Sequence, residues 1–368
     1  MEVAQPTFFN TDAQLIIDEM VSYYENLVGF KLSPGQAEML LINAFAYREH
    51  LLRIQGNEVA KQNLLAFSSY PMIDYLGDLL GVYRLPAASA QCTIRFYLES
   101  GHPAIALPEG IQVQSLDGKV IFKTLESKSV SIGVSSVDVK AECTTAGATG
   151  NGYNVGEISI ILDPQAYVRA ATNLANTNGG ADDEKDDALR ERIRLAPSSF
   201  STAGPDDAYI YFAKSAHPSI IDVGIKSLIP GTVNVYPLLL NAETPTTEIL
   251  EAIEAKLNPT KTRPLNDKVV VSAPTKLEYE VIANVVLLTG ALTDPVKSQI
   301  EKNVNDYVAL RKAKLGRDAV RTQLIAKINI DDVYEVDLVE PSSDVEADKN
   351  EVAYCTGVTI NIIGYSDE

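Results

Sequence analysis

The sequence is poor in the residues that build disulfide frameworks and metal sites. Its three cysteines, Cys92, Cys143 and Cys355, lie far apart and form no CxxC pair. An odd number of isolated cysteines argues against a disulfide framework and is typical of small buried side chains in a reducing cytosol. The three histidines are scattered too, with no HExxH or HxH spacing, so we predict no bound metal.

Long hydrophobic runs and positive charge are also scarce. No uninterrupted apolar run reaches the roughly 18 residues that a bilayer requires, and the N-terminal residues lack the basic and hydrophobic parts of a secretion signal. We therefore expect a soluble protein. The 31 basic residues against 49 acidic ones give a net charge of −18, which repels nucleic acid and anionic membranes. Neither is an expected partner.

Motifs of known catalysts are missing. There is no GxGxxG, GxxxxGK[ST] or GxSxG, and no cysteine beside a plausible histidine motif. The acidic run at 182–187 lacks the spacing of a calcium loop and is interpreted as the start of a helix. The catalytic pair of a glycosidase needs two carboxyl groups that face each other across a cleft. The number of carboxylates in a sequence does not show whether the fold brings two of them into that position. We predict no enzymatic activity and no cofactor.

Apolar residues make up 46% of the 368 residues, enough for several packed cores. We predict a multidomain α+β protein. Residues 1–90 form an N-terminal helical bundle segment, and residues 91–180 form a central β-rich domain. Two tandem C-terminal α/β modules, each of two layers, follow at 181–275 and 276–368.

Helical periodicity dominates the N-terminal region. A first helix is predicted from Thr11 to Gly29. SPGQ at 33–36 is the start signal of a second helix, with the serine as its cap, and no proline interrupts it before Pro71. Some thirty residues would extend roughly 45 Å. A kink in this helix, or a division into two helices, is expected at Gly56.

One short neighbour cannot bury the apolar residues of so long a helix. The short connection favours an antiparallel hairpin with the first helix, and a bundle with a partner is the alternative. A short helix follows from Pro71 to Gly81, and the alternation in QCTIRFYL predicts a strand.

Short β-runs separated by turn residues continue to about residue 173. Residues 208–273 then alternate as helix, two strands, helix and strand. The rest of the chain predicts a strand at 277–288, two helices, a strand at 333–341 and a last strand at 358–364. No residue-level repeat links these two modules.

Several segments, in their order and spacing, resemble the baseplate J-like family, the wedge proteins of contractile phage tails and R-type tailocins. They are AYREHLLRIQGNEVAKQNLLAF, IDYLGDLLGVYRLPAASA, LPEGIQVQS with VIFKT, GNGYNVGEI, NTNGGADDEKDDALRERI, SFSTAGPDDAYIYFAKSAHPSIIDVGIKS and PGTVNVY. SSYPMID departs from the pattern of relatives, which carry a small residue and glycine before the LD or ID pair.

The resemblance implies a structural baseplate wedge subunit. Two copies join one copy of a second wedge protein through N-terminal helices. Their C-terminal parts link neighbouring wedges into a ring around the central hub or spike complex, and the ring clamps the sheath-initiating baseplate protein. The implied location is the tail baseplate of a virion or tailocin, after synthesis in the host bacterial cytoplasm.

On this hypothesis the helix from Ser33 to Phe67 contributes the bundle, and the region from Tyr209 to Gly364 makes the ring contact. The predicted bundle interface consists of Leu40, Leu51, Leu52, Val59, Leu64 and Leu65. One sequence in two unequal positions needs hinges that let rigid modules rearrange on sheath contraction. We place hinges at 84–90 and 198–205, with Arg84, Pro86, Gly204 and Pro205 as hinge residues.

Two other functions are weighed. A tail-associated cell-wall hydrolase would need a carboxylate pair in a cleft and lytic activity of the purified chain. A host-binding tail protein would predict a trimeric β-rich shaft, which the helical N-terminal region argues against.

Overall fold

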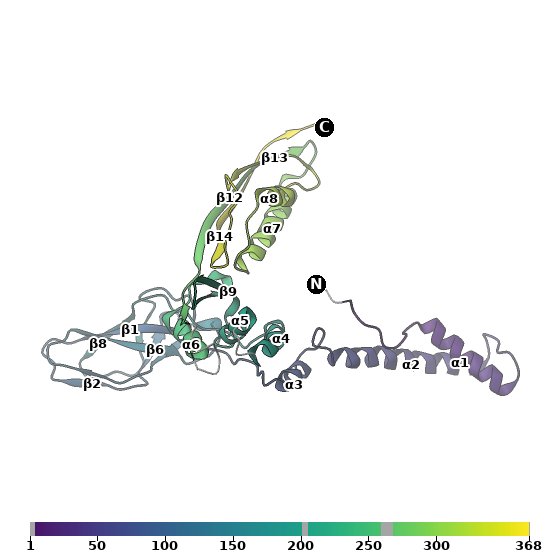
Figure 1. The fold of residues 1–368 in the computed structure, drawn as a ribbon, viewed down its shortest axis with the longest axis horizontal. Coiled ribbons are helices and arrows are strands. Elements are labelled where there is room, and N and C mark those ends of the chain that lie inside the picture. The colour runs from purple at the N-terminus through teal and green to yellow at the C-terminus, as the bar shows by residue number, and fades with distance from the viewer. Residues whose placement is uncertain (1–3, 201–204, 259–267, 368) are drawn as a thin grey trace. The chain divides into compact units, whose positions relative to one another are not determined.

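The computed structural model describes residues 4–200, 205–258 and 268–367 (Figure 1). The chain divides into two compact units. The first contains the residues up to Tyr83 together with Asp186–Ile193, and the second contains Arg84–Lys185 and the residues from Arg194 onward. The multidomain α+β class is confirmed, and the four domain boundaries stay predictions.

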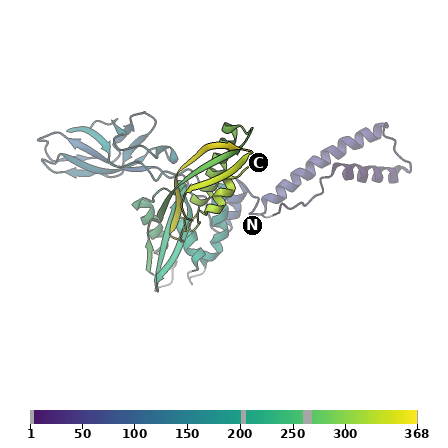
Figure 2. The same cartoon turned by 90° about the horizontal axis from the view of Figure 1, so that it is seen from above.

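The first unit begins with two helices, α1 (Ala13–Val28) and α2 (Ala37–Gln62), which pack as a hairpin (Figures 1 and 2). The predicted internal hairpin is therefore confirmed. The predicted start at Thr11 is wrong, because Asp12 is the cap and its side chain accepts hydrogen bonds from the N–H groups of Gln14 and Leu15. The predicted stop at Gly29 is confirmed by its left-handed backbone, with φ 79°.

Helix α2 is shorter than predicted at both ends. Residues 33–36 form a turn in which the side chain of Gln36 accepts a hydrogen bond from the N–H of Ser33, and α2 begins after this turn, with Gln36 and not Ser33 as its N-terminal flanking residue. The 26 residues of α2 span about 39 Å and continue through Gly56 without a break. The helix ends at Gln62, and its side chain accepts a hydrogen bond from the N–H of Ser69 in the following turn.

Two further helices complete the first unit, α3 (Met72–Asp78) and α4 (Asp186–Leu195). Helix α3 follows a cis peptide bond between Tyr70 and Pro71 and ends at Asp78, before the predicted stop at Gly81, which has a positive φ in the turn that follows. Helix α4 comes from a distant part of the sequence. Its Ile193 side chain packs so closely on Gly77 that an added Cβ there would lie 3.2 Å from it.

The predicted β-rich domain is confirmed as a six-stranded sheet in the order β7-β3-β4-β6-β1-β8, close to a barrel. Its core includes Phe96 and Phe122, both fully buried. The strands are β1 (Gln91–Leu98), β3 (Gln112–Ser115), β4 (Ile121–Thr124), β6 (Ser136–Cys143), β7 (Ile158–Ile161) and β8 (Val168–Asn173). A separate pair joins β2 (Ile105–Leu107) and β5 (Lys128–Val130).

The next module has the predicted order of helix, two strands, helix and strand. Its elements are α5 (Asp206–Lys214), β9 (Ile220–Ile229), β10 (Thr232–Leu239), α6 (Thr247–Leu257) and β11 (Lys268–Val271). Strands β9 and β10 are antiparallel, whereas β11 lies parallel to β10 after the crossover through α6. Short 3₁₀ turns occur at Ala148–Gly150, Ala196–Phe200 and Leu240–Ala242.

The last module is a three-stranded sheet in the order β13-β12-β14, with α7 packed on β14. Its elements are β12 (Thr275–Leu288), α7 (Thr293–Lys312), α8 (Arg321–Ile328), β13 (Val333–Glu340) and β14 (Glu351–Ser366). Strand β14 begins at Glu351, well before the predicted Val358. It pairs in parallel with β12 from Thr275 onward, and this long pairing extends the strand.

Candidate functional site on the helical hairpin

The contact between α1 and α2 is narrow. Helix α1 fully buries Ile16, and α2 buries Ile42, Ala46 and Asn57. Residues four apart along a helix share one face, so a strip of this kind covers only part of the circumference of α2. Apart from the part around Asn57, where the segment before α1 lies, much of the remaining surface of α2 is uncovered in the described part of the first unit.

Most of the predicted bundle residues lie on that uncovered surface. Leu40 is 67% exposed, and Leu65 alone among the six is half-buried. The other four are exposed: Leu51, Leu52, Val59 and Leu64. None of the six contributes a buried side chain to the hairpin, and their role as an interface stays a prediction.

The exposed apolar side chains of α2 have a regular spacing. Phe45, Leu52 and Val59 recur every seven residues and are 65%, 63% and 61% exposed. A seven-residue repeat is the spacing of helices that pack along their length against another helix. Other large exposed apolar side chains of α1 and α2 are Leu15, Tyr23, Leu27, Leu41, Tyr47 and Ile54. We name the apolar stripe by its three repeating residues, Phe45, Leu52 and Val59.

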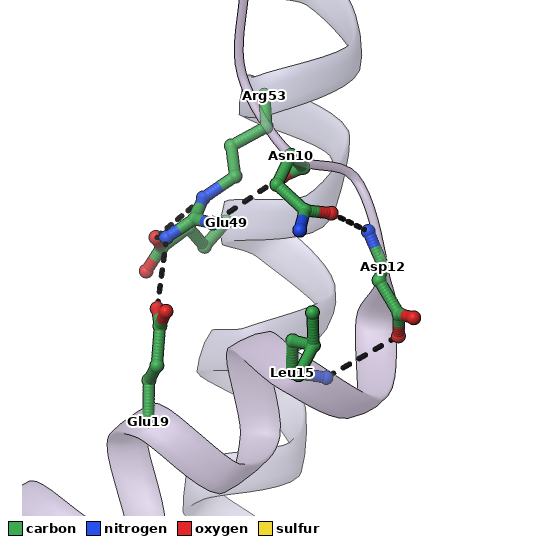
Figure 3. Close-up of polar contacts among 6 residues, drawn as sticks. All are labelled: Asn10, Asp12, Leu15, Glu19, Glu49 and Arg53. Carbon is green, nitrogen blue, oxygen red and sulfur yellow. Dashed lines mark hydrogen bonds and ion pairs between the residues drawn. The ribbon is translucent and has the colours of Figure 1, made fainter.

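Arg53 joins α2 to α1 through a group of polar contacts (Figure 3). Its guanidinium donates to the carboxylate of Glu49 one turn earlier and lies 3.4 Å from a carboxylate oxygen of Glu19 in α1. It also donates to the backbone carbonyl of Asn10 at 3.3 Å. Because these groups come from both helices and from the segment before α1, they fix the register of the hairpin.

The segment before α1 lies on the C-terminal half of α2. The side-chain oxygen of Asn57 accepts hydrogen bonds from the N–H groups of Phe8 and Phe9, both at 2.9 Å, and its amide donates to the carbonyl of Phe9. The ring of Phe9 lies against Gly56, where an added Cβ would be 3.1 Å from it. Gly56 thus provides space for an aromatic ring and does not kink the helix.

Arginines of α4 hold the segment that follows α2. Arg190 donates to the carbonyls of Leu65 and Ser68 at 2.8 and 2.7 Å, and the buried Arg192 donates to the carbonyl of Tyr83. Arg190 also contacts Asp187 within α4. The backbone contacts could not be predicted from the sequence, because nothing local links segments so far apart in the chain.

The first predicted hinge segment starts where the second unit starts, at Arg84. Arg84 donates to the carbonyl of Glu184, and the N–H of Leu85 donates to the carboxylate of Glu184 at 3.0 Å. Pro86 lies next to this anchored residue. The chain also passes between the units after Lys185 and after Ile193, so a rotation here would involve all of these connections.

In the second predicted hinge segment, Pro205 precedes α5 as its N-terminal flanking residue. Gly204 lies outside the described residues. The hinge residues stay predictions.

The three histidines lie in separate places. Both ring nitrogens of the buried His102 lie against backbone carbonyls, those of Val134 and Pro103, and these contacts raise its pKa. Burial lowers the pKa of His217. Within the described ranges, no three His, Cys, Asp or Glu side chains come close enough together to hold a metal ion. None of the helices in the same ranges has the length and apolar character that a bilayer crossing requires.

Four models of one protein family match the chain in order. They are the Baseplate J-like N-terminal domain at residues 38–91, the barrel domain at 93–180, the central domain at 201–273 and the C-terminal domain at 279–361. The chain belongs to the Baseplate J-like family. The resemblance inferred from the sequence segments is thereby confirmed.

Individual members of the family and solved structures were also compared with this chain. Baseplate protein J of Escherichia phage P2 is 28% identical over 186 residues, which are 50% of this chain and 61% of that relative. A chain in the cryo-EM structure of the anti-feeding prophage baseplate, 6-fold symmetrised, matches with a TM-score of 0.42 and 14% identity. That match covers 92% of this chain and 89% of the other.

Proposed function

We propose that this Baseplate J-like protein is a structural component of a contractile-tail baseplate and acts without enzymatic activity. The observation that carries the proposal is the apolar stripe of Phe45, Leu52 and Val59 on α2. Side chains of this size, repeated along a helix, are costly to leave in water and mark a surface for another protein. The name of the phage P2 relative supports a baseplate as the location.

In finer detail, we propose a wedge subunit. Two copies join a second wedge protein through α2, and the region from Tyr209 to Gly364 links neighbouring wedges into a ring around the hub or spike complex. The ring holds the sheath-initiating protein and rearranges on contraction. The assembly forms in the host bacterial cytoplasm and becomes part of a virion or tailocin tail.

The test is the double variant Leu51→Asp/Leu52→Asp, coexpressed with the second wedge protein. Two carboxylates placed on the exposed surface of α2 would have to be desolvated in a helical bundle, which costs several kcal/mol per buried charge. We expect copurification with the second wedge protein to be lost while the variant stays folded by circular dichroism. Copurification at the wild-type level would contradict the helical interface.

The matched control is Asn43→Asp/Gln55→Asp. It adds the same two charges at exposed polar positions of the same helix. We expect copurification to persist in this control. If copurification is lost in both variants, the added charge and not the apolar surface is responsible, which contradicts the helical interface.

A further inference from the structure

Strand β14 leaves one edge of the last sheet open. In the order β13-β12-β14, its only sheet neighbour among the described strands is β12. The pairing register skips Thr356 and Ile363, so Gly357–Ile362 form a regular stretch between two bulges. An open, regular edge presents unpaired N–H and C=O groups to any strand that approaches.

The two edges of this sheet differ in chemistry. The outer strand β13 carries Glu335, Asp337 and Glu340, charges of the kind that protect an edge from pairing. Strand β14 contains no lysine, arginine or proline, and its single charge, Glu351, lies at its first residue. The regular stretch of β14 is therefore neutral along its whole length, although the chain carries a net charge of −18.

The regular stretch is complementary to a reversed copy of itself. Facing residues in an antiparallel pair share one face of the sheet, so a two-fold axis at Ile360 places Val358 opposite Ile362 and Thr359 opposite Asn361. Val358 and Ile362 pack on the core of the module yet are only partly buried. Thr359 and Asn361 lie exposed on the other face. The pairing would cover the apolar residues and place a hydroxyl opposite an amide.

We propose that the edge of β14 at Gly357–Ile362 pairs antiparallel with the same edge of a second copy, joining the two sheets into one. The inference deepens the proposed ring contact between copies and rests on that proposal. Two copies of this acidic chain would repel each other if the edges that meet carried charges. The neutral edge of β14 avoids that repulsion.

Two double variants of the full chain test the pairing. Thr359→Lys/Asn361→Lys places lysine opposite lysine twice across the two-fold axis, whereas Thr359→Lys/Asn361→Glu places lysine opposite glutamate twice. Both change the same exposed positions. All proteins carry Leu51→Asp/Leu52→Asp, and the protein with these two changes alone is called the parent. Because the two changes remove the proposed helical interface, any association that remains does not depend on α2.

Sedimentation velocity at low salt measures the association over a range of concentrations. We expect the parent and the lysine–glutamate variant to dimerise, and the dissociation constant of the lysine–lysine variant to rise about tenfold or more. A parent that stays monomeric overturns the proposal. Equal behaviour of the two variants overturns it too, because a different partner strand or surface would not distinguish them.

Hydrogen exchange of the parent provides a second measurement that needs no variant at the edge. The amides of residues 357–362 that point away from β12 should gain protection as the protein concentration rises. If the lysine–lysine variant fails to fold, this measurement decides the matter, since unchanged protection at concentrations where the parent dimerises overturns the proposal.

Discussion

The helical hairpin and the junction between the two C-terminal modules use different means to hold two elements together. The hairpin buries few apolar side chains and depends on polar contacts such as those of Arg53 and Asn57. The junction buries an apolar cluster of Leu238, Ala242, Leu315 and Val352. The hairpin therefore leaves large apolar side chains of α2 exposed, whereas the two modules bury theirs in a shared cluster.

Backbone contact makes the junction especially tight. The N–H of Leu315 donates to the carboxylate of Asp222 at 2.9 Å, and the ammonium of Lys226 lies 2.6 Å from the carboxylate of Asp348. Gly224 in β9 lies directly against the loop before β14. An added Cβ at this glycine would be 1.8 Å from the carbonyl oxygen of Lys349.

The largest effect is expected from Gly224→Ala at the junction. The added methyl group cannot fit unless the backbone of β9 or of the loop moves, and overpacking of this kind costs about 3 kcal/mol or more. The free energy of unfolding from urea titration measures the loss. Gly364→Ala is the control, because nothing lies within 4 Å of its added Cβ, and we expect a change within about 1 kcal/mol. Equal effects would show that the junction is loosely packed.

A smaller effect is expected from Asn57→Ala in the hairpin. The substitution removes its hydrogen bonds to the backbone of Phe8 and Phe9, but water can replace them in part, so we expect a loss of about 1 to 2 kcal/mol. Amide exchange at Phe8 and Phe9 should accelerate by about tenfold. Asn43→Ala changes the same residue type at an exposed position of α2 and should leave that exchange unchanged. Slow exchange in both variants would mean that other contacts hold the segment.

The smallest effects concern pH and should have opposite signs in the two regions. A hydrogen bond from Lys31, assisted by the N–H of Leu32, lowers the pKa of Glu25 in the hairpin. Its contribution to stability is present above the unfolded pKa and is lost as pH falls through the folded pKa. Burial raises the pKa of Asp222 at the junction. Stability from this group is lost as pH rises through its folded pKa, so acidification strengthens the junction.

Neutral variants separate these two contributions. Glu25→Gln should flatten the acid loss of hairpin stability, and Asp222→Asn should remove the gain at the junction, since an amide oxygen can still accept from Leu315. Hydrogen exchange resolved by residue and followed from roughly pH 7 to pH 4 measures both regions in one sample. The same sign of pH dependence in both regions would contradict the assignment.

Local patterns predicted much of the fold. The alternation in 91–98 predicted β1, and the glycine stop predicted the end of α1. Start signals were less reliable, since Asp12 and not Thr11 caps α1, and α2 begins at Ala37. Thr11 and Asp12 are neighbours and either side chain could cap a helix, so the local sequence does not decide which of them does.

The candidate site was predicted only in part. Helical spacing identified exposed leucines of α2, but the roles of Asn57 and Gly56 were missed. The isolated glycine in the middle of a helix was the available signal, because glycine there is costly unless another group approaches closely. Nothing in the sequence indicated which group that was.

The order of helices and strands and membership of the family could be predicted from the sequence alone. These properties follow from the spacing of apolar residues and from motifs within short stretches of chain. Tertiary structure alone decided that Phe9 lies on Gly56, that Arg190 binds the carbonyls after α2, and that Gly224 lies against Lys349. Each of these contacts joins residues far apart in the chain, and only the folded backbone brings them within a few ångströms.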